Sequence, residues 1–128
     1  MGGELRLTSN HFQGISLDIV VKSDLDGLIQ NNDVIGLDRG LGLRLSVATP
    51  PGGRLLVQDN RINRVNGPCI TVLKGSPESP RIVDNVLSFC KDACIVVERG
   101  SSCLIGDNVF FPNGLGVLVL NNSKPVFE

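Results

Sequence analysis

An asparagine recurs along this chain with a spacing that no single helix or hairpin explains. The intervals are 22, 28, 25 and 23 residues, in the series Asn10, Asn32, Asn60, Asn85 and Asn108. An aliphatic residue stands three positions before each one, in the series Leu7, Ile29, Val57, Ile82 and Ile105. Two positions after stand Phe12, Val34, Ile62, Leu87 and Phe110. A period of roughly 20–50 residues is typical of repeat architectures, so the sequence predicts one structural unit used about five times.

Each unit carries a second alternating apolar pair about ten residues after its Asn. These pairs are Ile19/Val21, Leu43/Leu45, Ile70/Val72, Ile95/Val97 and Val117/Val119. Alternation with period two, broken by Gly and Pro, indicates short strands separated by bends. Such a unit buries its apolar face only when another unit stacks on it, at about 4.8 Å.

Units of 22 or more residues suit a three-sided coil, and parallel crossovers are right-handed by strong preference. The sequence therefore predicts an all-β fold, a right-handed single-stranded parallel β-helix of about five coils of 22–28 residues. Residues 1–128 would form a single domain.

The Asn column has a physical reason in this fold. Asn tolerates left-handed backbone angles at a bend, and one unpaired buried amide would cost about 1–3 kcal/mol. Stacked amides can instead bond to one another along the column. We therefore predict an internal Asn ladder, with the Asn85 amide facing inward between Asn60 and Asn108.

Residues 80–87 (PRIVDNVL), followed by residues 93–97 (ACIVV), resemble the parallel β-helix repeat of pectin-lyase-like proteins. With residues 74–76 (KGS) as lead-in, they are similar to the repeats of carbohydrate-binding and sugar-hydrolase β-helices and of F-box-containing β-helix proteins. The resemblance covers residues 4–128 and implies the fold. It does not imply one function, because this repeat serves lyases, hydrolases, epimerases, ubiquitin-ligase adaptors and phage fibres.

Composition disfavours several classes of partner. Aromatic residues are only 4% of the chain, with no Trp and no Tyr, whereas sugar and single-strand nucleic-acid sites usually stack their ligands on rings. The net charge of −1 offers no basic field for phosphates. No apolar run reaches the roughly 20 residues that span a bilayer. We expect neither a nucleic-acid nor a membrane partner, and no cofactor.

The four cysteines, Cys69, Cys90, Cys94 and Cys103, match no paired zinc pattern, and the only histidine, His11, is far from them in sequence. We expect reduced thiols in or near the core, and no metal site. With no secretory signal at the start of this chain, this predicts a cytoplasmic protein.

An acidic residue precedes three of the ladder positions, giving a row of Asp59, Asp84 and Asp107 with Arg61 nearby. One interpretation is a binding site for calcium or sugar, because polysaccharide lyases of this fold use acidic rows with calcium. The other is that each Asp caps backbone N–H groups at its turn, and we favour it. No motif assigns a catalytic residue.

The ends and one corner are the remaining candidate surfaces. Only four residues precede Leu5, so we expect no capping helix, and residues 124–128 look like the opening of a sixth coil. Either the chain is a segment of a longer solenoid, which we favour, or copies associate through open ends that expose Leu5, Leu7, Phe12, Val117, Val119 and Phe127. Length variation falls at one corner, at residues 23–26, 47–53, 74–79 and 100–102.

These observations leave three functions open. The leading one is a non-catalytic binding or scaffold module, which recognises a partner through a lateral sheet or the insertion-bearing corner. The first alternative is part of a carbohydrate-active enzyme or glycan-binding protein, and the second is an end-to-end self-assembling structural unit. The partner, protein or polysaccharide, stays undetermined at this point.

Overall fold

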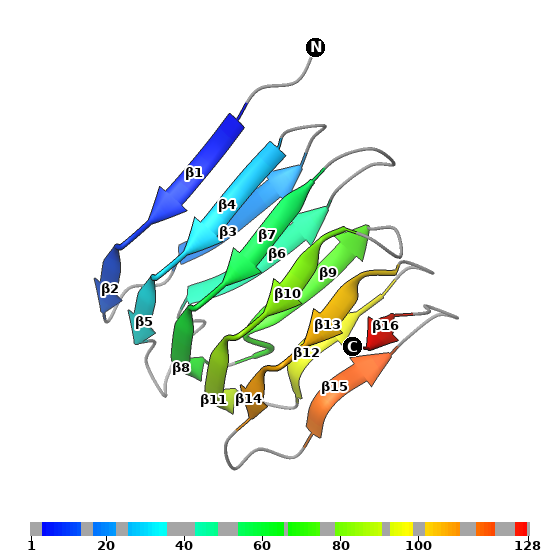
Figure 1. Cartoon of the computed structure of the whole chain (residues 1–128). Helices are drawn as coiled ribbons and strands as arrows, with labels where there is room; N and C mark the ends of the chain where they lie inside the picture. The colour runs from blue at the N-terminus through cyan, green and yellow to red at the C-terminus, as the bar shows by residue number, and fades with distance from the viewer. Residues whose placement is uncertain are drawn as a thin grey trace.

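The computed structural model describes residues 4–13, 17–22, 26–35, 43–48, 54–65, 67–74, 79–90, 93–98, 102–110, 115–119 and 125–127. Within these residues the chain forms sixteen strands and no helix. Consecutive strands belong to three different sheets, so the chain passes from one sheet to the next and returns one layer further on (Figure 1).

Three parallel sheets form the walls of the coil, which we call sheets A, B and C. Sheet A contains β1 (Glu4–Thr8), β4 (Asp26–Gln30), β7 (Leu55–Gln58), β10 (Arg81–Val83), β13 (Leu104–Gly106) and β16 (Val126–Phe127). Sheet B contains β2 (His11–Gln13), β5 (Asp33–Ile35), β8 (Arg61–Val65), β11 (Val86–Cys90) and β14 (Val109–Phe110). Sheet C contains β3 (Leu17–Lys22), β6 (Leu43–Ala48), β9 (Ile70–Lys74), β12 (Ala93–Val97) and β15 (Leu115–Val119).

The repeat predicted from the sequence is the stacking register of these sheets. In sheet A, Leu7 pairs with Ile29, and the series continues through Val57, Ile82 and Ile105 to Phe127. In sheet B the series runs through Phe12, Val34, Ile62, Leu87 and Phe110. The predicted parallel β-helix of about five coils is therefore confirmed, with β16 as the first strand of a sixth.

Sheet C confirms the second predicted pair of columns in four coils and corrects it in the second coil. Ile95 pairs with Ile70 on one side and with Val117 on the other, and Val97 pairs with Val72 and Val119. In β6 the pair is Leu45/Val47 and not the predicted Leu43/Leu45, because Leu45 pairs with Ile19 and Ile70. The longer connection between β5 and β6 shifts the pair by two residues. Most of the insertion-bearing corner lies outside the described residues, so its predicted role in recognition stays a prediction.

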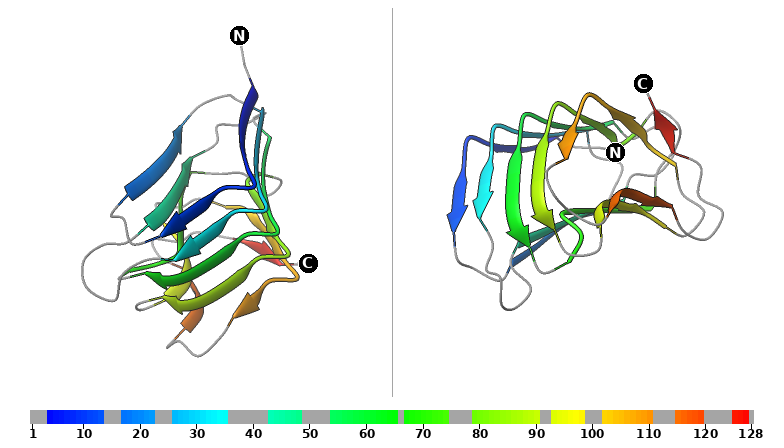
Figure 2. Two further views of the ribbon diagram at one scale, coloured as in Figure 1. Left: turned by 90° about the vertical axis from the view of Figure 1, so that its left-hand side faces the viewer. Right: turned by 90° about the horizontal axis from the view of Figure 1, so that it is seen from below.

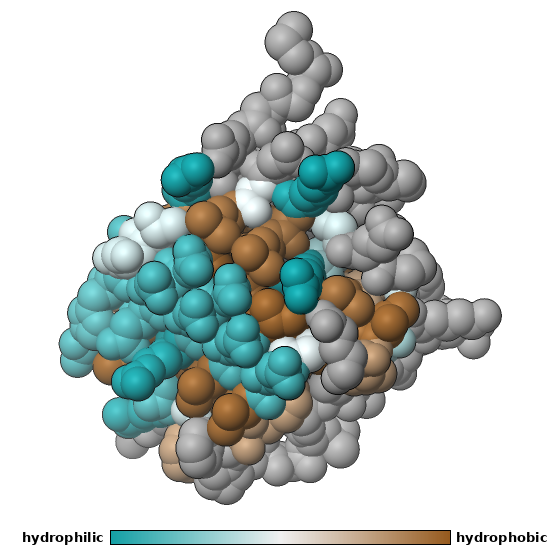
Figure 3. Space-filling model, in the orientation of Figure 1, coloured by the Kyte–Doolittle hydropathy of each residue, from teal (hydrophilic) through white to brown (hydrophobic). Residues whose placement is uncertain are grey.

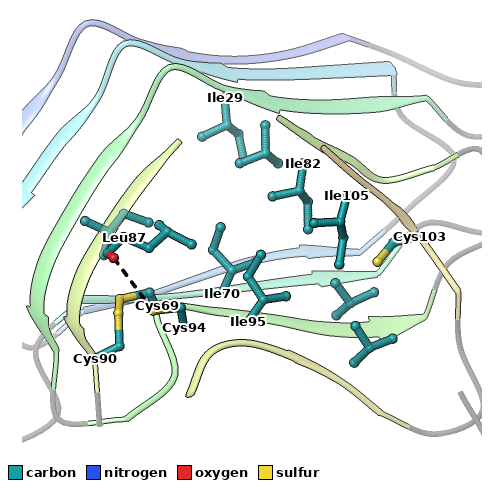
Figure 4. Close-up of a cluster of buried hydrophobic side chains, with 14 of the residues drawn as sticks. Ile29, Cys69, Ile70, Ile82, Leu87, Cys90, Cys94, Ile95, Cys103 and Ile105 are labelled. Atoms are coloured by element: carbon teal, nitrogen blue, oxygen red, sulfur yellow. Dashed lines mark hydrogen bonds between the residues drawn. A yellow bond between two sulfur atoms is a disulfide. The ribbon is translucent and has the colours of Figure 1, made fainter. Parts of the chain in front are cut away.

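The three sheets enclose a space (Figure 2), and the cluster of buried hydrophobic side chains lies within it. Ile82 and Ile105 of sheet A point toward Ile70 and Ile95 of sheet C across this space (Figure 4). Ile70, Ile82 and Ile95 are fully buried, and Leu7 and Phe12 of the first coil pack against the same cluster while remaining partly exposed. Burying one such side chain contributes about 1.5–3 kcal/mol, so the columns supply the main drive for stacking.

Candidate functional site

The asparagine ladder lies at the bend between sheets A and B and is confirmed as predicted. Each of the first four Asn residues donates from its backbone N–H and from Nδ2 to the Oδ1 of the Asn in the next coil. The side-chain bonds are 3.0, 2.9, 3.0 and 3.0 Å from the first pair, Asn10–Asn32, to the last, Asn85–Asn108. The backbone bonds to the same oxygens are 3.0–3.1 Å.

The remaining Nδ2 hydrogen of each later ladder residue bonds to a carbonyl of the preceding coil. Asn60 donates to the carbonyl of Ile29 at 2.9 Å, and Asn85 to that of Val57 at 3.0 Å. One Nδ2 hydrogen of Asn85 is shared with the carbonyl of Val83, and Asn85 is fully buried between Asn60 and Asn108. No buried side-chain nitrogen or oxygen in the described part of the chain lacks a partner.

The residue before each ladder Asn, and not the Asn itself, adopts the left-handed conformation. This turn column has φ between 52° and 58° and consists of Ser9, Asn31, Asp59, Asp84 and Asp107. The sequence-based explanation of the Asn column is therefore wrong in this respect. The ladder Asn points inward, so the change in chain direction falls on its exposed neighbour, where Asn, Asp and Gly are the residues that tolerate φ > 0.

The predicted acidic row consists of the last three residues of this turn column. Asp59, Asp84 and Asp107 are all exposed. Asp84 accepts a hydrogen bond from Nε2 of Gln58 at 3.2 Å. Among the described residues, no backbone N–H donates to any of the three carboxylates, so the structure does not support turn capping as their role. Backbone conformation accounts for these positions instead.

The structure places Arg61 beside the acidic row and not within it. Arg61 is exposed on sheet B, in register with Asp33 on one side and Val86 on the other. No group of three or more His, Cys, Asp or Glu side chains within the described segments is arranged to hold a metal ion. The residues predicted as a binding row are thus adjacent, but the geometry assigns them no ligand.

Sequence reasoning missed a polar cluster on the first two coils of sheet B. His11 Nδ1 lies 3.1 Å from Asp33 Oδ2, and His11 Nε2 lies 3.3 Å from Gln13 Oε1. His11 and Asp33 are both about half exposed, at 54% and 48%. The stacking register brings His11 over Asp33, and the interval of 22 residues between them was the only signal in the sequence.

The prediction of four reduced thiols is wrong for two of them. Cys69 and Cys90 form a disulfide across 21 residues, with their Cα atoms 5.6 Å apart. Cys90 pairs with Val65, so it takes the place that an aliphatic residue holds in the preceding coil. Cys69 is the residue directly before β9. Because the spacing between coils brings these positions together, the pair is a product of the stacking and not of any cysteine motif.

Cys94 and Cys103 form no disulfide and are fully buried, so the predicted core location is confirmed for them. Burial raises the pKa of the Cys94 thiol to about 11 and that of the Cys103 thiol to about 12. Both are therefore protonated at neutral pH, and a thiol nucleophile requires the thiolate. These two cysteines contribute packing and not chemistry.

The outer face of sheet A carries a continuous row of side chains, one from each coil. We call it the leucine row: Arg6, Leu28, Leu56, Arg81, Leu104 and Val126, in register from β1 to β16. The three leucines are half-buried, Val126 is 40% exposed, and both arginines are exposed. Figure 3 shows the apolar surface over sheet A, beside the hydrophilic surface of the turn column and sheet B.

Comparison with known proteins agrees with this architecture. Residues 1–110 match the family described as right handed beta helix region. The chain belongs to this family. The β-helix matches neither a curated protein nor a solved structure. No helix long and apolar enough to cross a membrane occurs among the described residues.

Proposed function

We propose that this β-helix is a non-catalytic binding module that recognises a protein partner through the leucine row of sheet A. The observation that carries the proposal is the row itself. Residues of sheet A alternate between inward positions such as Val57, which is fully buried, and outward positions such as Leu56. Outward positions on a solvated sheet are normally polar, so a column in which four of six strands present an aliphatic side chain requires a partner or another explanation.

The chemistry of the row favours a protein over a glycan or a nucleic acid. Among the described residues the outward positions of sheet A hold no aromatic ring, and rings are the usual platform for sugars and unpaired bases. Arg81 stands between Leu56 and Leu104, and Arg6 stands at the first coil, next to Leu28. A partner segment that presents apolar side chains with a carboxylate beside them would fit this pattern.

Between sheets A and B, sheet A is the one that carries a row of aliphatic side chains on its outer face. Sheet B is polar at its centre, where Ser88 donates to Oδ1 of Asn63 at 3.2 Å. Parallel strands hold the leucine row at a fixed repeat of about 4.8 Å, so the surface is pre-organised and loses little entropy on binding.

A displayed random-peptide library tests the proposal while the natural partner is still unidentified. We expect the β-helix to select peptides that combine aliphatic and acidic residues. Leu56→Glu should weaken binding of a selected peptide about tenfold or more, because it removes apolar contact and adds a repelling charge. Arg81→Glu should weaken acidic peptides further.

Ser88→Glu is the matched control, because it adds the same charge at a half-buried outward position of sheet B in the same coil as Arg81. It should leave binding unchanged. Peptides that bind the Leu56→Glu and Ser88→Glu variants equally would contradict the proposal. Selective binding on a glycan array that is lost in Asp84→Ala would instead favour the carbohydrate-active alternative.

A further inference from the structure

The asparagine ladder has a direction, and its two ends are chemically complementary. In each of the four Asn–Asn pairs, the earlier residue donates and the later one accepts. Oδ1 of Asn10 therefore accepts no hydrogen bond from any described residue. At the other end, the backbone N–H of Asn108 donates to no described residue, and its Nδ2 donates only to the carbonyl of Ile82.

Among the described residues, the inward column of sheet B is also partly exposed at both ends. In the last coil, Phe110 is 38% exposed. In the first coil, Phe12 is partly buried and heads the column that Phe110 ends. A coil placed beyond Phe110 would continue the column with an apolar side chain two positions after its own Asn. Phe12 stands at that distance from Asn10.

We propose that copies of this chain stack head to tail, with Asn108 of one copy donating to Oδ1 of Asn10 in the next. Phe12 would then cover Phe110. Two-fold pairing of the last coils would set donor against donor in the ladder, and two-fold pairing of the first coils would leave the Asn108 donors of both copies unused. Identical contacts that do not close on themselves produce open linear assemblies. This inference concerns the ends of the β-helix and goes beyond the lateral recognition proposed above.

In this register, β16 occupies the place beside β13 that β1 of the next copy would take. Phe127 pairs with Ile105, which precedes Asn108 by three residues, and Leu7 precedes Asn10 by three. An incoming β1 in ladder register would therefore put Leu7 where Phe127 lies. β16 pairs through two residues only, whereas β1 pairs with β4 through five. Stacking thus requires β16 to leave β13, and β16 limits assembly.

A variant that releases β16 tests this competition in the full chain. The Val126 N–H donates to the carbonyl of Cys103 at 2.7 Å, and Val126→Pro removes that donor. We expect light scattering across a concentration series to show association of this variant at concentrations about tenfold lower than for the unchanged chain. A Val126→Pro chain that stays monomeric at hundreds of micromolar would overturn the proposal.

A mixing experiment in the Val126→Pro background determines whether copies associate head to tail or head to head. Phe12→Lys blocks the first coil and Phe110→Lys blocks the last, at the two ends of one column. Each variant alone should stay monomeric, and an equimolar mixture should form a dimer and stop there. If either variant dimerises alone, the pairing is head to head and the proposal is wrong.

A milder substitution in the first coil controls for the case in which Phe12→Lys prevents folding. Asn10→Ala removes the terminal Oδ1 acceptor and only one bond within the chain, that from its Nδ2 to Asn32. In the Val126→Pro background it should weaken association about tenfold while circular dichroism shows an unchanged fold. Association at full strength in Asn10→Ala would contradict a joint made through the ladder.

Discussion

The asparagine ladder and the turn column run side by side through the coils of this β-helix, one residue apart in sequence. They differ in the number of amino-acid types that each contains. The ladder column is buried toward the middle of the stack and holds Asn at all five positions. The turn column is exposed in every described coil and holds Ser, Asn or Asp. Both recur with the same intervals, so position in the repeat does not explain the contrast.

The difference shows which physical demand selects an amino-acid type. A ladder residue must both donate and accept at fixed positions, and Asn is the short side chain that does so while leaving no buried group unpaired. A turn residue must only tolerate φ near 55°, and several polar residues do this at modest cost. Hydrogen-bond geometry therefore selects a single amino acid in the ladder, whereas backbone conformation selects only a class of amino acids in the turn column.

The largest expected effect is at the centre of the ladder. Asn85→Leu leaves the backbone N–H and Nδ2 of Asn60 without their shared acceptor. Since each buried unpaired group costs about 1–3 kcal/mol, we expect the free energy of unfolding to fall by about 2–5 kcal/mol. Urea denaturation measures this change. An unchanged midpoint would mean that buried pairing does not select Asn in this column.

In the turn column the choice of substitution should matter more than the loss of Asp. Asp84→Val puts a β-branched residue at φ 56° and should cost about 1–2 kcal/mol. Asp84→Gly and Asp84→Asn should cost little, because both residues tolerate this conformation. Thermal melts of the three variants give the ranking. Equal losses in all three would assign the position to its carboxylate and remove the contrast between the columns.

A smaller effect is expected at the start of the ladder. Asn10→Ala removes one partly buried bond, from Nδ2 to Asn32, and leaves the backbone N–H of residue 10 still donating to the same oxygen. The monomer should lose about 0.5–1.5 kcal/mol in urea denaturation. A loss as large as that of Asn85→Leu would show that the ladder acts as one cooperative unit and not as separate joints.

The smallest expected effect tests whether the turn column has a function beyond conformation. If Asp59, Asp84 and Asp107 bound calcium, the ion would raise the melting temperature by mass action. We expect no shift at millimolar calcium, measured by differential scanning fluorimetry. A saturable rise that disappears in Asp84→Ala would give this column a ligand and strengthen the carbohydrate-active alternative.

Much of the fold could be predicted because its contacts are periodic in sequence. The columns through Leu7 and Phe12, and the ladder of Asn10 to Asn108, are confirmed at the predicted positions. Less of the candidate site could be predicted from the sequence. The acidic row was found, but its left-handed conformation was not, because the inward orientation of Asn85 places the change in chain direction on Asp84.

The sequence by itself determined what repeats at one interval: which residues stack, which of them must be apolar, and where an amide must find another amide. Only the tertiary structure decided what depends on contacts between columns. The disulfide of Cys69 and Cys90 forms because different positions of successive coils meet at one corner. The leucine row emerges because alternation turns Leu56 outward while Val57 fills the core. Periodicity specifies neighbours along a column, but the path of the chain between sheets sets which columns meet and which face solvent.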